Sequence, residues 1–130
     1  MVKLIQDFWV ISQSGKVLYQ RVFNVEMHAQ LFGALLSALT SFSKEISDSG
    51  LTNFQSSSYK FIMLKKEPLD FVATSNAQDN VKKVKTNINK ISKIFFAKYK
   101  DILADWDNWD RNIDHFSDFE KDIKAYLKVK

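Results

Sequence analysis

The chain has 130 residues and a mass of 15.1 kDa, which is enough for one domain with a real hydrophobic core and too little for two. Hydrophobic residues make up 45% of it and aromatic residues 14%, so a mainly disordered state is excluded. The absence of cysteine excludes disulfide frameworks, thiolate metal sites and cysteine nucleophiles. We expect a single domain over residues 1–130 in a reducing compartment.

Charge is distributed unevenly along the chain, although the net charge is only +4. Residues 76–100 contain seven lysines and one acid, whereas residues 101–122 contain eight acids and two basic residues. No segment is long and apolar enough to suggest a membrane span, and the first residues do not resemble a secretory signal. We therefore expect a cytoplasmic protein that touches a membrane at most peripherally.

The first residues predict a hairpin. Residues 4–11 are apolar at both alternating sets of positions, which is typical of a strand covered on both faces of its sheet. A turn cluster follows at residues 12–16, and residues 17–23 resume an extended pattern that includes the polar Gln20 and Arg21. The more polar second strand suits the edge of a sheet.

A first helix is predicted over about residues 25–48, with Asn24 as its N-cap and Gly50 placed to end it. Its apolar arc covers about 200° of the helix surface, which is more than one sheet requires. The remaining face carries small residues about one turn apart, which let another backbone approach closely. These small residues are Ala29, Gly33, Ser37 and Thr40.

Three strands are predicted after this helix. Residues 51–58 suit only a weak edge strand, whereas residues 59–64 and 69–74 are stronger, and Pro68 breaks the chain between them. The order of elements is then strand, strand, helix, three strands and two helices. Antiparallel strands with helices on both faces give an α+β layer architecture.

Two helices are predicted to close the chain. The longer one runs from a cap at Ser75 or Asn76 to about Leu103, and the last one covers about residues 113–127. The apolar stripe of the longer helix consists of Val81, Val84, Ile88, Ile91, Phe95, Tyr99 and Ile102. The stripe of the last helix consists of Phe116, Phe119, Ile123 and Leu127.

The residues that could support catalysis are scattered. The two histidines, His28 and His115, fall in different predicted elements, so a shared metal or catalytic role is not expected. The three glycines stand alone, so no glycine-rich loop is present to bind phosphate. We expect no enzyme, no cofactor and no catalytic residue.

An acidic run at residues 105–114 resembles a calcium loop only superficially. Asp110, Asn112 and Asp114 alternate as in an EF-hand, but the following glycine is replaced by His115 and the twelfth-position glutamate by Lys121. We therefore expect no metal site. A solvated connection, with Trp106 and Trp109 packed on the core, explains the run better.

The lysines of the longer helix gather within about 100° on the side away from its apolar stripe. They are Lys82, Lys83, Lys90, Lys93 and Lys100. A solvated helix face is the commoner explanation of such a run, and an anionic membrane surface is the functional alternative. No aromatic residue is interleaved with them, so nucleic acid is not expected as a partner.

Several segments share a hydrophobic pattern with a known family: residues 7–11, 14–16, 31–39, 71–73, 94–96, Trp106 and 116–119. Together with the element order, they resemble the longin family, whose members include adaptor small subunits, Sedlin-like tethering subunits and the N-terminal domains of some SNAREs. The resemblance spans nearly the whole chain.

The longin resemblance implies a three-layer α/β/α sandwich. Its five-stranded antiparallel sheet has the strand order 2-1-5-4-3, with the first helix on one face and the last two on the other. Related profilin-like and roadblock folds differ mainly in helix placement, and the C-terminal helix pair favours longin. No SNARE heptad region follows, so the resemblance implies a standalone domain.

The function implied by the resemblance is a non-catalytic interaction module of a vesicle-trafficking or small-GTPase regulatory complex. It would form a homodimer, or a heteromer with another longin-like or roadblock-like subunit, and a small GTPase is a further implied partner. From the residues, we expect the contact on the small-residue face of the first helix and on the second strand at Gln20, Arg21 and Val22.

A ligand sensor of the profilin-like or PAS-like kind is the alternative. Phe8, Trp9, Phe61 and Phe71 would line its pocket, although core packing explains the same residues more simply. A peripheral membrane adaptor that uses the lysine face is a third possibility.

Overall fold

The computed structural model describes residues 4–12, 16–22, 51–55, 59–66, 68–110 and 112–128. The predicted first helix, over residues 25–48, lies outside them. The strands are β1 (Asp7–Ser12), β2 (Val17–Arg21), β3 (Leu51–Gln55), β4 (Tyr59–Lys66) and β5 (Leu69–Asn76). The helices are α2 (Val81–Lys98), α3 (Lys100–Ala104) and α4 (Phe119–Ile123), with the 3-10 helices η2 (Trp106–Asn108), η3 (Ile113–Phe116) and η4 (Lys124–Tyr126).

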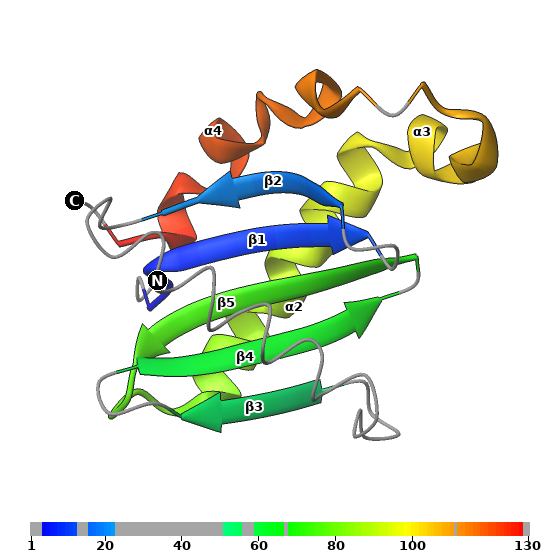
Figure 1. The fold of residues 1–130 in the computed structure, drawn as a ribbon. Coiled ribbons are helices and arrows are strands. Elements are labelled where there is room, and N and C mark those ends of the chain that lie inside the picture. The colour runs from blue at the N-terminus through cyan, green and yellow to red at the C-terminus, as the bar shows by residue number, and fades with distance from the viewer. Residues whose placement is uncertain are drawn as a thin grey trace.

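The strands form one antiparallel sheet in the order β2-β1-β5-β4-β3 (Figure 1). This is the order that the longin resemblance implies. β1 and β5 are neighbours near the middle of the sheet, and all six residues of β1 are buried. The prediction that the first strand is covered on both faces is therefore confirmed.

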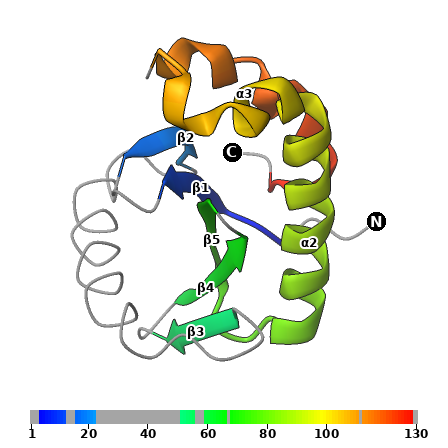
Figure 2. The same ribbon diagram turned by 90° about the vertical axis from the view of Figure 1, so that its right-hand side faces the viewer.

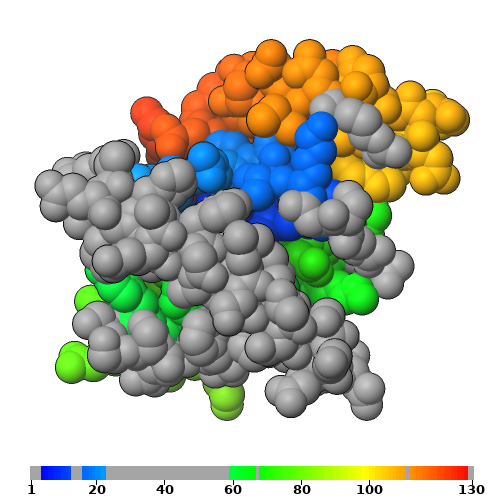
Figure 3. Space-filling model, in the orientation of Figure 1, coloured from blue at the N-terminus to red at the C-terminus, as the bar shows by residue number. Residues whose placement is uncertain are grey.

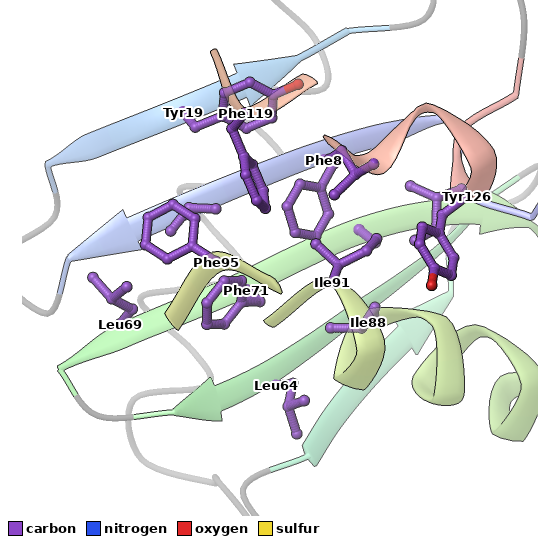
Figure 4. Packing of buried hydrophobic residues seen from close by; sticks show 14 of the residues in the cluster. Phe8, Tyr19, Leu64, Leu69, Phe71, Ile88, Ile91, Phe95, Phe119 and Tyr126 are labelled. Atoms are coloured by element: carbon purple, nitrogen blue, oxygen red, sulfur yellow. The ribbon is translucent and has the colours of Figure 1, made fainter. Parts of the chain in front are cut away.

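The larger core lies on the face of the sheet along which α2 runs (Figure 2). Phe95 of α2 is at its centre, where its ring centroid lies 4.8 Å from that of Tyr99 and 5.0 Å from that of Phe119. Phe71 of β5 reaches the same ring from the sheet, at 5.7 Å (Figure 4). The predicted apolar stripe of this helix is confirmed, since its inner members are fully or almost fully buried: Val84, Ile88, Ile91, Phe95 and Tyr99.

A second, smaller cluster occupies the opposite face of the sheet. It consists of Trp9, Ile11, Phe61, Met63 and Val72, all at most 5% exposed. Each member comes from a strand, and none of the described helices contributes to it. Alternate residues of β1 thus enter different cores, because successive side chains of a strand point to opposite faces.

The predicted start of the second helix was wrong. β5 continues through Ser75 and Asn76, which pair with Lys60 and Tyr59 of β4. The helix instead begins after Asn80, whose side-chain oxygen accepts hydrogen bonds from the backbone N–H groups of residues 82 and 83 at 2.8 and 3.3 Å. Strand pairing therefore overrode the local capping signal of Ser75 and Asn76.

The prediction of one continuous last helix was also wrong. The segment consists of η3, α4 and η4, and Asn112 caps η3 by accepting a hydrogen bond from the N–H of Asp114 at 3.0 Å. The apolar stripe itself is confirmed, because Phe116, Phe119, Ile123 and Leu127 are all buried. None of the helices among the described residues is long and apolar enough to cross a membrane.

Candidate functional site

The structure places β2 at the outside of the sheet, as the sequence predicts. β2 pairs with β1 on one side, but the register shifts along the pair. Val10 is opposite Tyr19 and Ile11 is opposite Val17, so Leu18 is an extra residue, and both Leu18 and Tyr19 enter the larger core. A bulge of this kind bends an edge strand. The regularly paired part of β2 follows the bulge, at residues 19–21.

Gln20 is the member of the predicted β2 contact that faces solvent. It pairs with Trp9, so its side chain lies on the face of the smaller cluster. Val22 is half-buried and packs against that cluster. Of the three residues of this predicted contact, two in β2 and Val22 just after it, Gln20 is therefore the most exposed.

Arg21 has a role within the fold. Its guanidinium donates hydrogen bonds to the backbone carbonyls of Gln6 and Lys128. Beside it, Ile5 and Leu127 form a parallel bridge in which the N–H of Lys128 donates to the Ile5 carbonyl at 2.8 Å. Arg21 thus joins three segments where β2 ends, and the sequence had no local signal for this.

The C-terminal segment packs beside β2. η3 contacts β2, and atoms of the C-terminal part of the chain, coloured orange, lie along the blue β2 in the space-filling view (Figure 3). The ring of Tyr19 meets that of Phe119 edge-on at 5.3 Å. The ammonium of Lys16 lies 5.8 Å from the Trp109 ring, which in turn stacks on Trp106 at 5.0 Å. The predicted packing of these two tryptophans against the core is confirmed.

Ile113 is a residue that sequence reasoning missed. It begins η3, beside β2, and is 44% exposed, which makes it the exposed large hydrophobic residue among the described residues. The sequence did contain a signal for this exposure, because Ile113 falls outside the apolar stripe of the last segment. A single exposed apolar residue does not by itself mark an interface, but its place beside β2 puts Ile113 within reach of a partner bound at that edge.

Two titratable groups, Tyr19 in β2 and Asp110 after η2, have shifted pKa values. Burial of the Tyr19 hydroxyl, which has no hydrogen-bond partner in the structure, raises its pKa well above the usual range. Asp110 accepts a hydrogen bond from the Asn112 N–H and contacts the His115 ring at 3.0 Å, and both interactions lower its pKa. Tyr19 therefore stays neutral and Asp110 stays charged near neutral pH.

The five lysines of the predicted anionic-surface contact are all exposed. We call them the lysine stripe: Lys82, Lys83, Lys90, Lys93 and Lys100. None of them forms an ion pair with another residue in the described part of the chain. Lys98 lies outside the stripe and pairs with Asp122 of α4.

The proposed sensor pocket does not assemble from the residues expected to line it. Phe8 and Phe71 belong to the larger core, whereas Trp9 and Phe61 belong to the cluster on the opposite face. The polar groups beside these rings, on Asp7 and Thr74, are hydrogen-bonded to each other: the Thr74 hydroxyl donates to the Asp7 carboxylate at 2.6 Å. The four aromatic side chains therefore share no common cavity.

The other half of the predicted contact belongs to the first helix. Ala29, Gly33, Ser37 and Thr40 lie outside the described residues, as does His28. The structure consequently describes the predicted contact only at β2 and its neighbours.

The antiparallel sheet, with α2 and the C-terminal segment packed in one core on the same face, defines an α/β protein of the longin type. The family model for the first longin domain of FUZ, MON1 and HPS1 matches residues 6–98, from β1 to the end of α2. The chain belongs to this longin family. No curated protein sequence matches the chain.

Proposed function

We propose that the chain is a non-catalytic interaction module of a vesicle-trafficking or small-GTPase regulatory complex. It assembles with a second copy of itself, or with another longin-like or roadblock-like subunit. Longin domains of FUZ, MON1 and HPS1 are found in trafficking complexes, and such domains are generally not catalytic. The family match is the observation that carries this proposal.

The contact surface of the proposal combines β2 with the small-residue face of the first helix. Gln20 lies exposed on the sheet edge, and Ile113 lies exposed on the neighbouring η3. Strand addition at such an edge supplies backbone hydrogen bonds, and an apolar side chain beside it supplies buried area. Both features favour a protein partner over a small ligand.

The three-layer arrangement is part of the same proposal. Trp9 is fully buried on the face away from α2, and no helix of the described residues contributes to its cluster. The helical pattern of residues 25–48 is wide enough to cover that face and still to present Gly33 and its small neighbours outward.

Sedimentation over a range of concentrations tests the proposal. We expect wild type, alone or with a copurifying longin-type subunit, to form a complex that Gln20→Lys weakens, because a lysine on a sheet edge opposes strand addition. Gly33→Arg is expected to weaken the same complex by separating the helices. Gln78→Lys, at an exposed turn position after β5, is the matched control and should assemble normally.

Two results would contradict the proposal. The first is a strictly monomeric chain that retains no longin-type subunit. The second is a complex whose stability is the same in Gln20→Lys, Gly33→Arg and Gln78→Lys, because that complex would use a different surface.

A further inference from the structure

We infer that the lysine stripe is an electrostatic docking surface for a membrane that contains anionic lipids. This goes beyond the proposed function and does not depend on it. Lys82, Lys83, Lys90 and Lys93 are exposed on α2, which runs over one face of the sheet (Figure 2), and the exposed Lys100 begins α3. The β2 edge is a different part of the molecule, so a protein partner and a membrane can be bound together.

The helix that carries the stripe has an unusual charge composition. α2 has 18 residues, of which six are lysines and none is acidic. Solvated helices usually mix both signs, because acid–base pairs three or four residues apart stabilise them. Here Lys82 and Lys85, and Lys90 and Lys93, are like-charged neighbours three residues apart. A solvated surface alone does not explain the absence of acids.

The position of the first two stripe lysines is also unfavourable for the helix. Lys82 and Lys83 lie in the first turn, where the helix dipole favours negative charge. A sequence selected for helix stability would place Glu at position 83, three residues after the N-cap Asn80. The nearest acid, Asp79, already accepts a hydrogen bond from the N–H of Asn76 at 3.0 Å and lies 3.8 Å from the Lys128 ammonium.

The side-chain chemistry favours a lipid surface over a protein. Every basic residue of α2 is lysine, a flexible point charge, whereas specific contacts to carboxylates and phosphates favour the planar guanidinium of arginine. Lysine is depleted in protein interfaces, which are built around apolar or aromatic anchors. Phe96 follows Lys93 by three residues, but its ring packs against Phe71.

The dimensions of the stripe suit a flat, diffuse negative charge. At 1.5 Å per residue, the stripe lysines of α2, from Lys82 to Lys93, span about 17 Å. Lysines spread over this length can approach many lipid headgroups at once without a pocket that selects one of them. Each lysine near an anionic membrane strengthens binding by about fivefold.

Cosedimentation with vesicles tests the inference. The vesicles are phosphatidylcholine alone and phosphatidylcholine with about 30% phosphatidylserine. We expect binding only to the anionic vesicles and a steep loss of that binding as ionic strength rises. Lys90→Gln/Lys93→Gln should weaken it by about 25-fold.

The matched control removes the same charge elsewhere. Lys121→Gln/Lys124→Gln neutralises two exposed lysines of α4 and η4, and it should leave vesicle binding within about twofold of wild type. Equal losses in the two double variants would overturn the inference, because net charge alone would then explain binding. Absence of binding to anionic vesicles would also overturn it, as would binding to polyglutamate without binding to vesicles, which would indicate an acidic protein partner.

Discussion

The guanidinium of Arg21, on the edge strand β2, donates a hydrogen bond to the backbone carbonyl of Lys128, more than a hundred residues away along the chain. A second donor of the same group reaches the carbonyl of Gln6. The C-terminal segment is held at the same point, because Lys128 also pairs with Ile5. Arg21 therefore closes one corner of the sheet, next to the surface proposed for assembly.

Replacement of Arg21 should reduce stability more than assembly. Arg21→Met removes two charge-assisted hydrogen bonds and should lower the free energy of unfolding by about 1–3 kcal/mol, measured by urea denaturation. Arg21→Lys should lie between wild type and Arg21→Met, because one ammonium does not reproduce the planar fork. Unchanged stability combined with lost assembly would instead place Arg21 in the interface.

The pair formed by Asp7 and Thr74 joins the two central strands. The Thr74 hydroxyl donates to the Asp7 carboxylate at 2.6 Å and accepts from the Asp7 N–H at 3.0 Å, and both residues are buried. Thr74→Val should lower the free energy of unfolding by about 1–3 kcal/mol, because a buried carboxylate loses a donor. Thr74→Ser should retain most of the stability. Thr86→Val, at an exposed position of α2, is the control and should change stability by less than about 0.5 kcal/mol.

Phe95 should be among the residues most sensitive to truncation. Its ring contacts those of Phe71, Tyr99, Phe116 and Phe119, and it is fully buried. Phe95→Ala should cost about 3–5 kcal/mol of unfolding free energy, which is a large part of the stability of a domain this size. Phe96→Ala removes the same atoms from a half-buried position and should cost clearly less. Equal costs in a denaturant titration would contradict the core described here.

Lys83 offers a test of whether the stripe opposes helix stability. Lys83→Glu places an acid in the first turn, where it can complete a capping box with Asn80, and should raise the free energy of unfolding by about 0.5 kcal/mol. Lys90→Glu, in the middle of the helix, lacks this advantage and serves as the control. A Lys83→Glu variant less stable than wild type would contradict this, because the lysine at position 83 would then not destabilise the helix.

Tyr99 should contribute to alkaline destabilisation. Burial, assisted by the carboxylates of Asp122 and Asp118, raises the pKa of Tyr99 from 10.0 to about 12. The folded state then holds this proton more tightly than the unfolded chain, so the stability is complete below pH 10 and is lost as the pH rises towards 12. Tyr99→Phe should flatten the fall in urea midpoint over this range, and an unchanged fall would contradict the assignment.

The periodicity of the sequence was sufficient for the strands and for the apolar stripes. β1 is apolar on both faces and proved to be central, and the stripe of α2 proved to be buried. Local sequence was insufficient where a distant pairing decided the structure. Ser75 and Asn76 resemble a helix cap, but their pairing with β4 keeps them in a strand.

The same limit applies to the candidate site. Gln20 could be placed on an edge from polarity alone, whereas the role of Arg21 depends on the carbonyl of Lys128, which no local pattern reveals. α4 ends at Ile123 for a related reason, since the chain turns at residues 124–126 before Lys128 pairs with Ile5. Exposure of the lysine stripe was predictable, because its members lie opposite the apolar stripe.

The absence of cysteine allows a direct test of assembly through β2. Gln20→Cys and Gln78→Cys each provide one thiol for a nitroxide label, and both positions are exposed. Electron paramagnetic resonance spectra are then recorded with and without the assembly partner, at concentrations where sedimentation shows the complex. The account predicts that the label at position 20 becomes immobilised in the complex while the label at position 78 stays mobile. A label at position 20 that stays as mobile as in the free chain would contradict it.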